Sequence, residues 1–198
     1  MEHSLPSRTK NSERILLSLY EMLTRIQVAD KPQGNEEDAI ALLLGCHQRI
    51  RHFTATALRI AQNPRASASE KAEAASSVLR YFEAALPLHE ADENESVYPR
   101  LHRRLPAGAL ADANEDMVRQ HTEIDAAIAE LIPMWRSTAK TEAQPSNALL
   151  LAKTEHLQSL WDAHLSLEEE RVLPAMRKYL TPEDLDGIRS EMRSRRES

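Results

Sequence analysis

The stretch "HLSLEEERVLPAM", residues 164–176, places a histidine four positions before the first of three glutamates and is closed by a proline. Residues i and i+4 of a helix lie on one face about a turn apart, so His164 and Glu168 can aim an imidazole and a carboxylate in the same direction. Such a pair is either an ordinary contact on a solvated helix face or part of a metal site.

The same pattern occurs a second time in "HEADENESVYP", residues 89–99, where His89 lies four positions before Glu93 and a proline again follows. In both copies the proline lies ten positions after the histidine. A lone histidine precedes each copy at nearly equal distance, His47 before the first and His121 before the second. One such pair is expected by chance, whereas two matched copies favour a helix hairpin that is used twice with a shared role.

Composition narrows the classes of fold and function. The chain has 198 residues, enough for one domain with a full core, and only four glycines, which favours helix almost throughout. Its net charge is −6 with acids and bases interspersed, so nucleic acid is not an expected partner. The apolar runs are too short to span a membrane and the N-terminus lacks a signal-peptide core, so we expect a cytoplasmic protein without a membrane partner.

The single cysteine, Cys46, excludes a thiolate zinc cluster, because such a cluster needs several sulfurs. We expect Cys46 to be a small core residue. Any metal ligands would then be imidazoles and carboxylates, a donor set that suits iron, manganese or zinc.

The fold class that we predict is all-α: an up-and-down four-helix bundle with an additional N-terminal helix and a short C-terminal helix. Apolar periodicity places helices over about residues 12–28, 36–62, 69–98, 112–138 and from about 147 to 172 or 179, with Asn35 as a helix cap. Pro99 should close the third of these, and Pro133 should bend or end the fourth. "TPED", residues 181–184, begins the last helix, whose tail should be solvated and frayed. The corresponding regions are 1–34, 35–180 and 181–198.

If the four bundle helices turn their histidine faces inward, six side chains converge in the interior: His47, His89, Glu93, His121, His164 and Glu168. Two glutamates among four histidines suit a pair of metal ions, because each carboxylate can bridge while histidines occupy the outer positions. Without metal, the same cluster would consist of buried polar groups that lack partners.

The repeated pattern of a lone histidine followed by His-x-x-x-Glu before a proline resembles hemerythrin-like proteins of the HHE cation-binding type, over about residues 39–178. The resemblance implies a non-haem di-iron centre with Glu93 and Glu168 bridging and the four histidines as terminal ligands. Asp125 stands where oxygen-carrying hemerythrins have a second histidine, so the ligand set is closer to that of iron- and oxygen-sensing members. Glu90 and Glu169 match positions that supply a carboxylate in some relatives, and both are candidate extra ligands.

Three functions follow in order. The first is a metal-binding protein with two iron ions, or zinc or manganese, that binds or senses oxygen, nitric oxide or iron itself. The second is a di-iron enzyme, namely an oxidase, a peroxidase or a repair protein, although no catalytic residue beyond the ligands is predicted. The third is a metal-free helical interaction module. The oligomeric state stays open.

Other conspicuous residues have ordinary structural interpretations. We expect surface or supporting positions for His3, His52, His102 and His156, surface charge for Glu170, and core packing for Phe53, Phe82, Tyr98 and Trp161.

Overall fold

The computed structural model describes residues 38–141 and 146–197, which belong to one compact unit, Glu37–Ser198. The predicted helix over residues 12–28 lies outside these residues, as do His3 and Asn35. Every regular element in the described part of the chain is a helix, which confirms the all-α prediction. None of these helices is long and apolar enough to cross a membrane.

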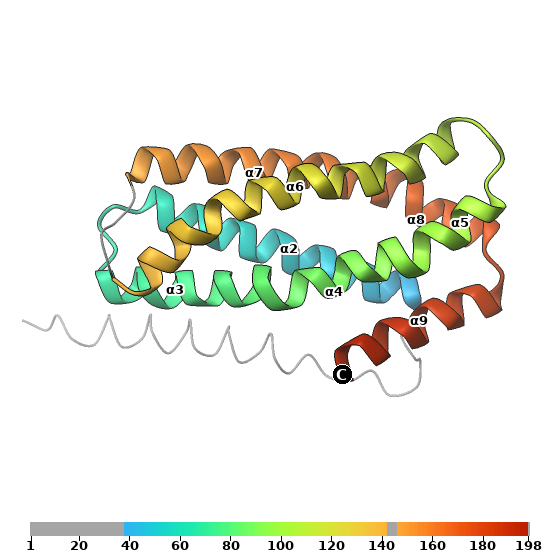
Figure 1. Ribbon diagram of the computed structural model, residues 1–198, viewed down its shortest axis with the longest axis horizontal. Coiled ribbons are helices and arrows are strands. Elements are labelled where there is room, and N and C mark those ends of the chain that lie inside the picture. Colours follow the sequence, from blue (N-terminus) through green and yellow to red (C-terminus); the bar gives the residue numbers. More distant parts are fainter. Residues whose placement is uncertain (1–37, 142–145, 198) are drawn as a thin grey trace, which may run out of the picture. The chain divides into compact units, whose positions relative to one another are not determined.

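The bundle consists of four helical rods (Figure 1). The first is α2 (Ala39–Gln62), which begins later than predicted because Asp38 caps it, accepting a hydrogen bond from the backbone N–H of Ala41 at 2.7 Å. The second rod begins with α3 (Ala68–Arg80), where Ser67 and Glu70 form a reciprocal capping box. The third is α6 (Ala109–Ala139), and it passes through Pro133 without ending, contrary to one of the two predicted outcomes.

The second and fourth rods are interrupted by wider, π-helical turns. The second continues from α3 through η1 (Tyr81–Ala85), α4 (Leu86–Ala91), η2 (Asp92–Val97) and α5 (Tyr98–Arg104). The fourth contains α7 (Asn147–Leu167), η3 (Glu168–Val172) and α8 (Leu173–Tyr179). Single π turns inside α-helices are frequent at functional sites.

Each π turn is followed, two positions on, by a proline: Pro87, Pro99 and Pro174. In each turn the residue before the proline donates its N–H to a carbonyl five positions back, for example Tyr98 to Glu93. Proline has no N–H and clashes with the carbonyl four residues earlier in a regular α-helix, so the wider turn accommodates it. The prediction that Pro99 closes the helix was therefore wrong, and the rod continues to Arg104.

The rods form a square in which α2 and α6 each pack against both α3 and α7 (Figure 1). The last helix, α9 (Pro182–Glu197), packs against α2, α4 and η2. Its predicted threonine cap is confirmed, because Thr181 Oγ1 accepts from the N–H of Asp184 at 3.2 Å. The prediction of a frayed, solvated tail was wrong: the helix reaches Glu197 and buries Met192.

Two apolar clusters fill the bundle, and a polar layer separates them along every rod. One cluster contains Ile50, Leu86, Ile124 and Trp161, and the other contains Leu43, Val97, Met117 and Val172. On each rod, the histidines and glutamates of the repeated pattern lie between a member of one cluster and a member of the other. Of the aromatic residues expected in the core, Phe82 and Trp161 are buried, whereas Phe53 and Tyr98 are partly buried against it.

Candidate metal centre

The polar layer consists of six buried side chains contributed by all four rods. They are His47 on α2, His89 on α4, Glu93 on η2, His121 on α6, His164 on α7 and Glu168 on η3, and none is more than 4% exposed. The structure thus brings together all six residues that the sequence predicted. Their role as metal ligands stays a prediction.

Glu93 lies between two imidazoles. Its Oε1 is 3.3 Å from Nε2 of His89, one helical turn away on the same rod. Its Oε2 is 3.1 Å from Nε2 of His121, on the neighbouring rod. The carboxylate therefore faces one histidine with each oxygen.

Glu168 repeats this arrangement. Its Oε1 is 3.3 Å from Nε2 of His164, its partner in the i,i+4 pair, and its Oε2 is 3.1 Å from Nε2 of His47 on α2. The duplicated sequence pattern thus becomes two carboxylates that each connect a histidine of their own rod with a histidine of another.

The donor atoms form two overlapping groups, and within each group all of them lie within 4.8 Å of one another. The first group contains His47, His89, Glu93 and Glu168, and the second contains Glu93, His121, His164 and Glu168. Both glutamates belong to both groups, whereas each histidine belongs to one. This is the donor pattern of two adjacent ions that share two carboxylates.

Three of the four imidazoles are held by a hydrogen bond from their outer nitrogen. Nδ1 of His47 donates to Glu169 Oε1 at 2.9 Å, and Nδ1 of His121 and His164 donate to Asn94 Oδ1 and Gln120 Oε1, each at 3.0 Å. An acceptor at Nδ1 fixes the ring and leaves the Nε2 lone pair for a metal, which is the usual support of metal-binding histidines. Among the described residues, no hydrogen-bond partner reaches Nδ1 of His89.

Glu169 supports His47 and is absent from both donor groups. Two nitrogens of Arg51 donate to its two oxygens at 2.8 and 3.1 Å. The residue is therefore neither an unpaired surface acid nor a member of the cluster. Sequence reasoning missed this role, as well as those of Asn94 and Gln120. The only available signal was that each lies directly beside a predicted ligand in the chain.

Burial and mutual charge set the protonation of the cluster. Burial lowers the pKa of His89 to about 3, and burial together with the charge of His164 lowers the pKa of His121 to about 4. These imidazoles are neutral at neutral pH, as metal coordination requires.

The two glutamates respond in opposite directions. Burial and the neighbouring charge of Glu168 raise the pKa of Glu93 well above its ordinary value. Burial also opposes the charge of Glu168, but the imidazoles of His164 and His47 outweigh it and hold its pKa at about 2. Two adjacent buried carboxylates without cations thus favour a single shared negative charge.

Several buried polar atoms of the cluster have no hydrogen-bond partner in the described part of the chain. These are Nε2 of His47, His89 and His164, and both carboxylate oxygens of Glu168. Buried polar groups without partners are costly, and all of these atoms face the interior of the cluster. The residues present therefore fit a pair of metal ions with imidazole and carboxylate ligands.

The other candidate residues lie outside the two donor groups. Glu90 is partly buried beside Asp125, and burial together with the charge of Asp125 raises the pKa of Glu90 to about 8. His52, His102, His156 and Glu170 are exposed, in agreement with their predicted surface positions. Cys46 is buried, as expected, and its sulfur accepts a hydrogen bond from Arg49 at 3.0 Å.

Comparison with protein families assigns most of the described chain. The family model of the hemerythrin HHE cation binding domain matches residues 38–176, from the cap of α2 into α8, a range that includes all six clustered residues. A comparison with curated proteins gave no match. With this match and with its buried histidine and glutamate groups, the chain belongs to the hemerythrin HHE family of cation-binding proteins.

Proposed function

We propose that the protein holds two metal ions in the polar layer, with iron as the physiological metal, and that it binds or senses oxygen, nitric oxide or iron through them. Glu93 and Glu168 would bridge the ions, while His47 and His89 would complete one site and His121 and His164 the other. The observation that carries the proposal is the placement of each carboxylate between two imidazole Nε2 atoms at 3.1–3.3 Å.

The donor set supports a small external ligand. Each group offers four protein residues, whereas iron accepts up to about six ligands, so positions remain for a diatomic molecule. Bound iron would supply redox-active ions with free coordination positions. The protein residues hold the imidazoles neutral, keep their rings oriented through Nδ1, and exclude bulk water from the cluster by burial.

Metal analysis of the protein after loading with ferrous iron under anaerobic conditions tests this proposal. We expect about two irons per chain, one for each donor group. His164→Ala should lose iron, whereas His156→Ala, on the same helix but exposed, should retain the wild-type content. A wild-type protein without stoichiometric metal, or a His164→Ala variant with full iron content, would contradict the proposal.

The same free positions also suit a di-iron oxidase, peroxidase or repair enzyme. The two functions differ in turnover. Reduced protein mixed with excess oxygen, peroxide or nitric oxide should take up a stoichiometric amount if it is a carrier or sensor, whereas an enzyme consumes the ligand over many cycles. The metal-free interaction module has less support, because it leaves the partnerless atoms of the cluster unexplained.

A further inference from the structure

The last helix, α9, lies beyond the part of the chain that the family model matches, yet it packs on the metal-binding half of the second rod. Its Ile188 and Met192 are buried in the same apolar cluster as Val97 and Leu101. The helix is therefore integrated into the bundle and contacts the rod that carries His89 and Glu93.

Ionic contacts attach α9 to this rod along its length. Near its start, Asp184 pairs with Arg104 at 2.7 Å, and farther on Glu191 pairs with Arg100 at 2.7 Å. Gly187 lies where Arg100 passes, because an added Cβ would be 3.0 Å from a guanidinium nitrogen. The contacts continue toward the metal centre and end at η2.

At the end of α9, two arginines hold one buried carboxylate. Arg195 is 3.0 Å from Oδ1 of Asp92, and Arg196 is 2.7 Å from its Oδ2. Asp92 is fully buried and directly precedes Glu93 within the π turn η2. A buried carboxylate needs cationic or hydrogen-bonding partners, so without these guanidinium groups the backbone beside Glu93 would have to rearrange to reach water.

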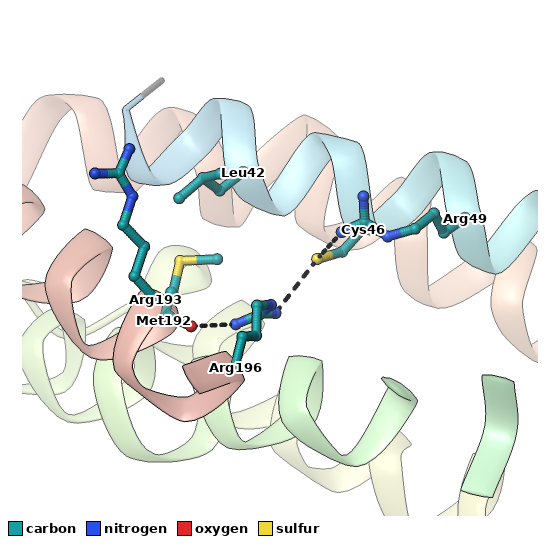
Figure 2. A pocket seen from close by; sticks show the side chains of 6 residues that line it. All are labelled: Leu42, Cys46, Arg49, Met192, Arg193 and Arg196. Atoms are coloured by element: carbon teal, nitrogen blue, oxygen red, sulfur yellow. Dashed lines mark hydrogen bonds between the residues drawn. The ribbon is translucent and has the colours of Figure 1, made fainter. Parts of the chain in front are cut away.

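Arg196 also reaches the first rod. One of its nitrogens lies 3.8 Å from Sγ of Cys46, and Figure 2 shows this guanidinium and that of Arg49 near the same sulfur. The contact borders a small cavity of about 50 Å³ between α2 and α9. Cys46 directly precedes His47. Arg196 therefore contacts the residues before His47 and before Glu93, on two different rods.

His47 and Glu93 belong together to the first donor group, whereas the histidines of the second group lie on α6 and α7. We propose that Arg195 and Arg196 are positioning residues for the first metal site, so that docking of α9 and occupancy of that site are thermodynamically coupled. This inference rests on the proposed binding of two metal ions. It predicts a selective effect, because Glu93 is held in place from α9 while His121 and His164 are not.

The test is a metal titration of the metal-free, full-length protein with Co²⁺, followed by calorimetry and by visible absorption. Wild type should show two sites. Arg196→Ala should weaken one of them by about ten- to a hundredfold, as loss of groups that support ligands typically does, and leave the other within about twofold. Arg196→Lys keeps the charge and should restore part of the lost affinity.

Asp184→Asn is the matched control, because it weakens the attachment of α9 at the end away from Asp92. It should keep both affinities near wild type. Equal weakening of both sites in Arg196→Ala, or the same selective loss in Asp184→Asn, would show a general effect of stability and overturn the positioning role. Two unchanged sites in Arg196→Ala would overturn it as well.

Hydrogen exchange gives a second readout that does not depend on the fold tolerating a substitution. Because coupling is reciprocal, Co²⁺ should slow amide exchange in residues 182–197 of the wild-type protein. Unchanged exchange there, in protein that has bound two ions, would overturn the coupling alone. A wild-type protein that binds no metal at all would overturn the proposed function together with this inference, so the two failures are distinguishable.

Discussion

Glu168→Gln is the substitution that most directly tests the shared carboxylates. The amide is nearly isosteric with the carboxylate but carries no negative charge, and its nitrogen cannot bind a cation. Glu168 belongs to both donor groups, so the change should impair both sites. His89→Ala removes a member of the first group only and should impair one.

The expected magnitude follows from linkage between binding and folding. A ligand at about 100 times its dissociation constant stabilises the folded state by about 2.7 kcal/mol per site, so two sites contribute about 5 kcal/mol. For a chain of this size about 1 kcal/mol shifts Tm by roughly 2–4 °C, which gives a metal-induced rise of roughly 10–20 °C in wild type. Glu168→Gln should abolish this rise, and His89→Ala should retain about half of it.

The assay is differential scanning calorimetry of each protein with and without metal. The difference between loaded and metal-free protein is compared, because it cancels the effect of the substitution on the metal-free fold. Glu170→Gln is the matched control, since Glu170 is exposed in the same acidic run, and it should keep the full rise. A Glu168→Gln protein with the wild-type difference would refute the reasoning that this carboxylate is shared by two ions.

Three further predictions follow. Glu169→Gln should weaken one metal site by about tenfold or more without removing it, measured by chelator competition, because Glu169 fixes the ring of His47 through Nδ1; an unchanged affinity would exclude that role. The hydrogen bond with Arg100 lowers the pKa of Glu191 below 4.5, so its contribution to docking of α9 is present above that pH and is lost as the pH falls through the lowered pKa. Amide exchange in α9 should therefore accelerate below about pH 4, and unchanged protection under those conditions would contradict the prediction. Met117→Ala, at a fully buried position, should reduce the free energy of unfolding by about 2–5 kcal/mol in urea titrations, and a loss below 1 kcal/mol would show that the core closes around the cavity.

Local sequence determined the helices and the six residues of the polar layer. The i,i+4 spacing of His89 with Glu93 and of His164 with Glu168 acts within one helical turn, so it can be interpreted without knowledge of the rest of the fold. The lone histidines followed from the duplication. The sequence also marked the π turns through Pro99 and Pro174, but the α-helical rule for proline predicted an end to the second rod at Pro99, where the chain instead widens one turn and continues.

Only the tertiary structure decided which groups face each other. Glu168 meets His47, and Asp92 meets Arg196, across separations of more than 100 residues, and no periodicity encodes such pairs. The same applies to Glu169, which resembled surface charge until α2 placed His47 against it. Helical spacing determines the direction of a side chain relative to its own axis, whereas the packing of the rods determines what lies in that direction.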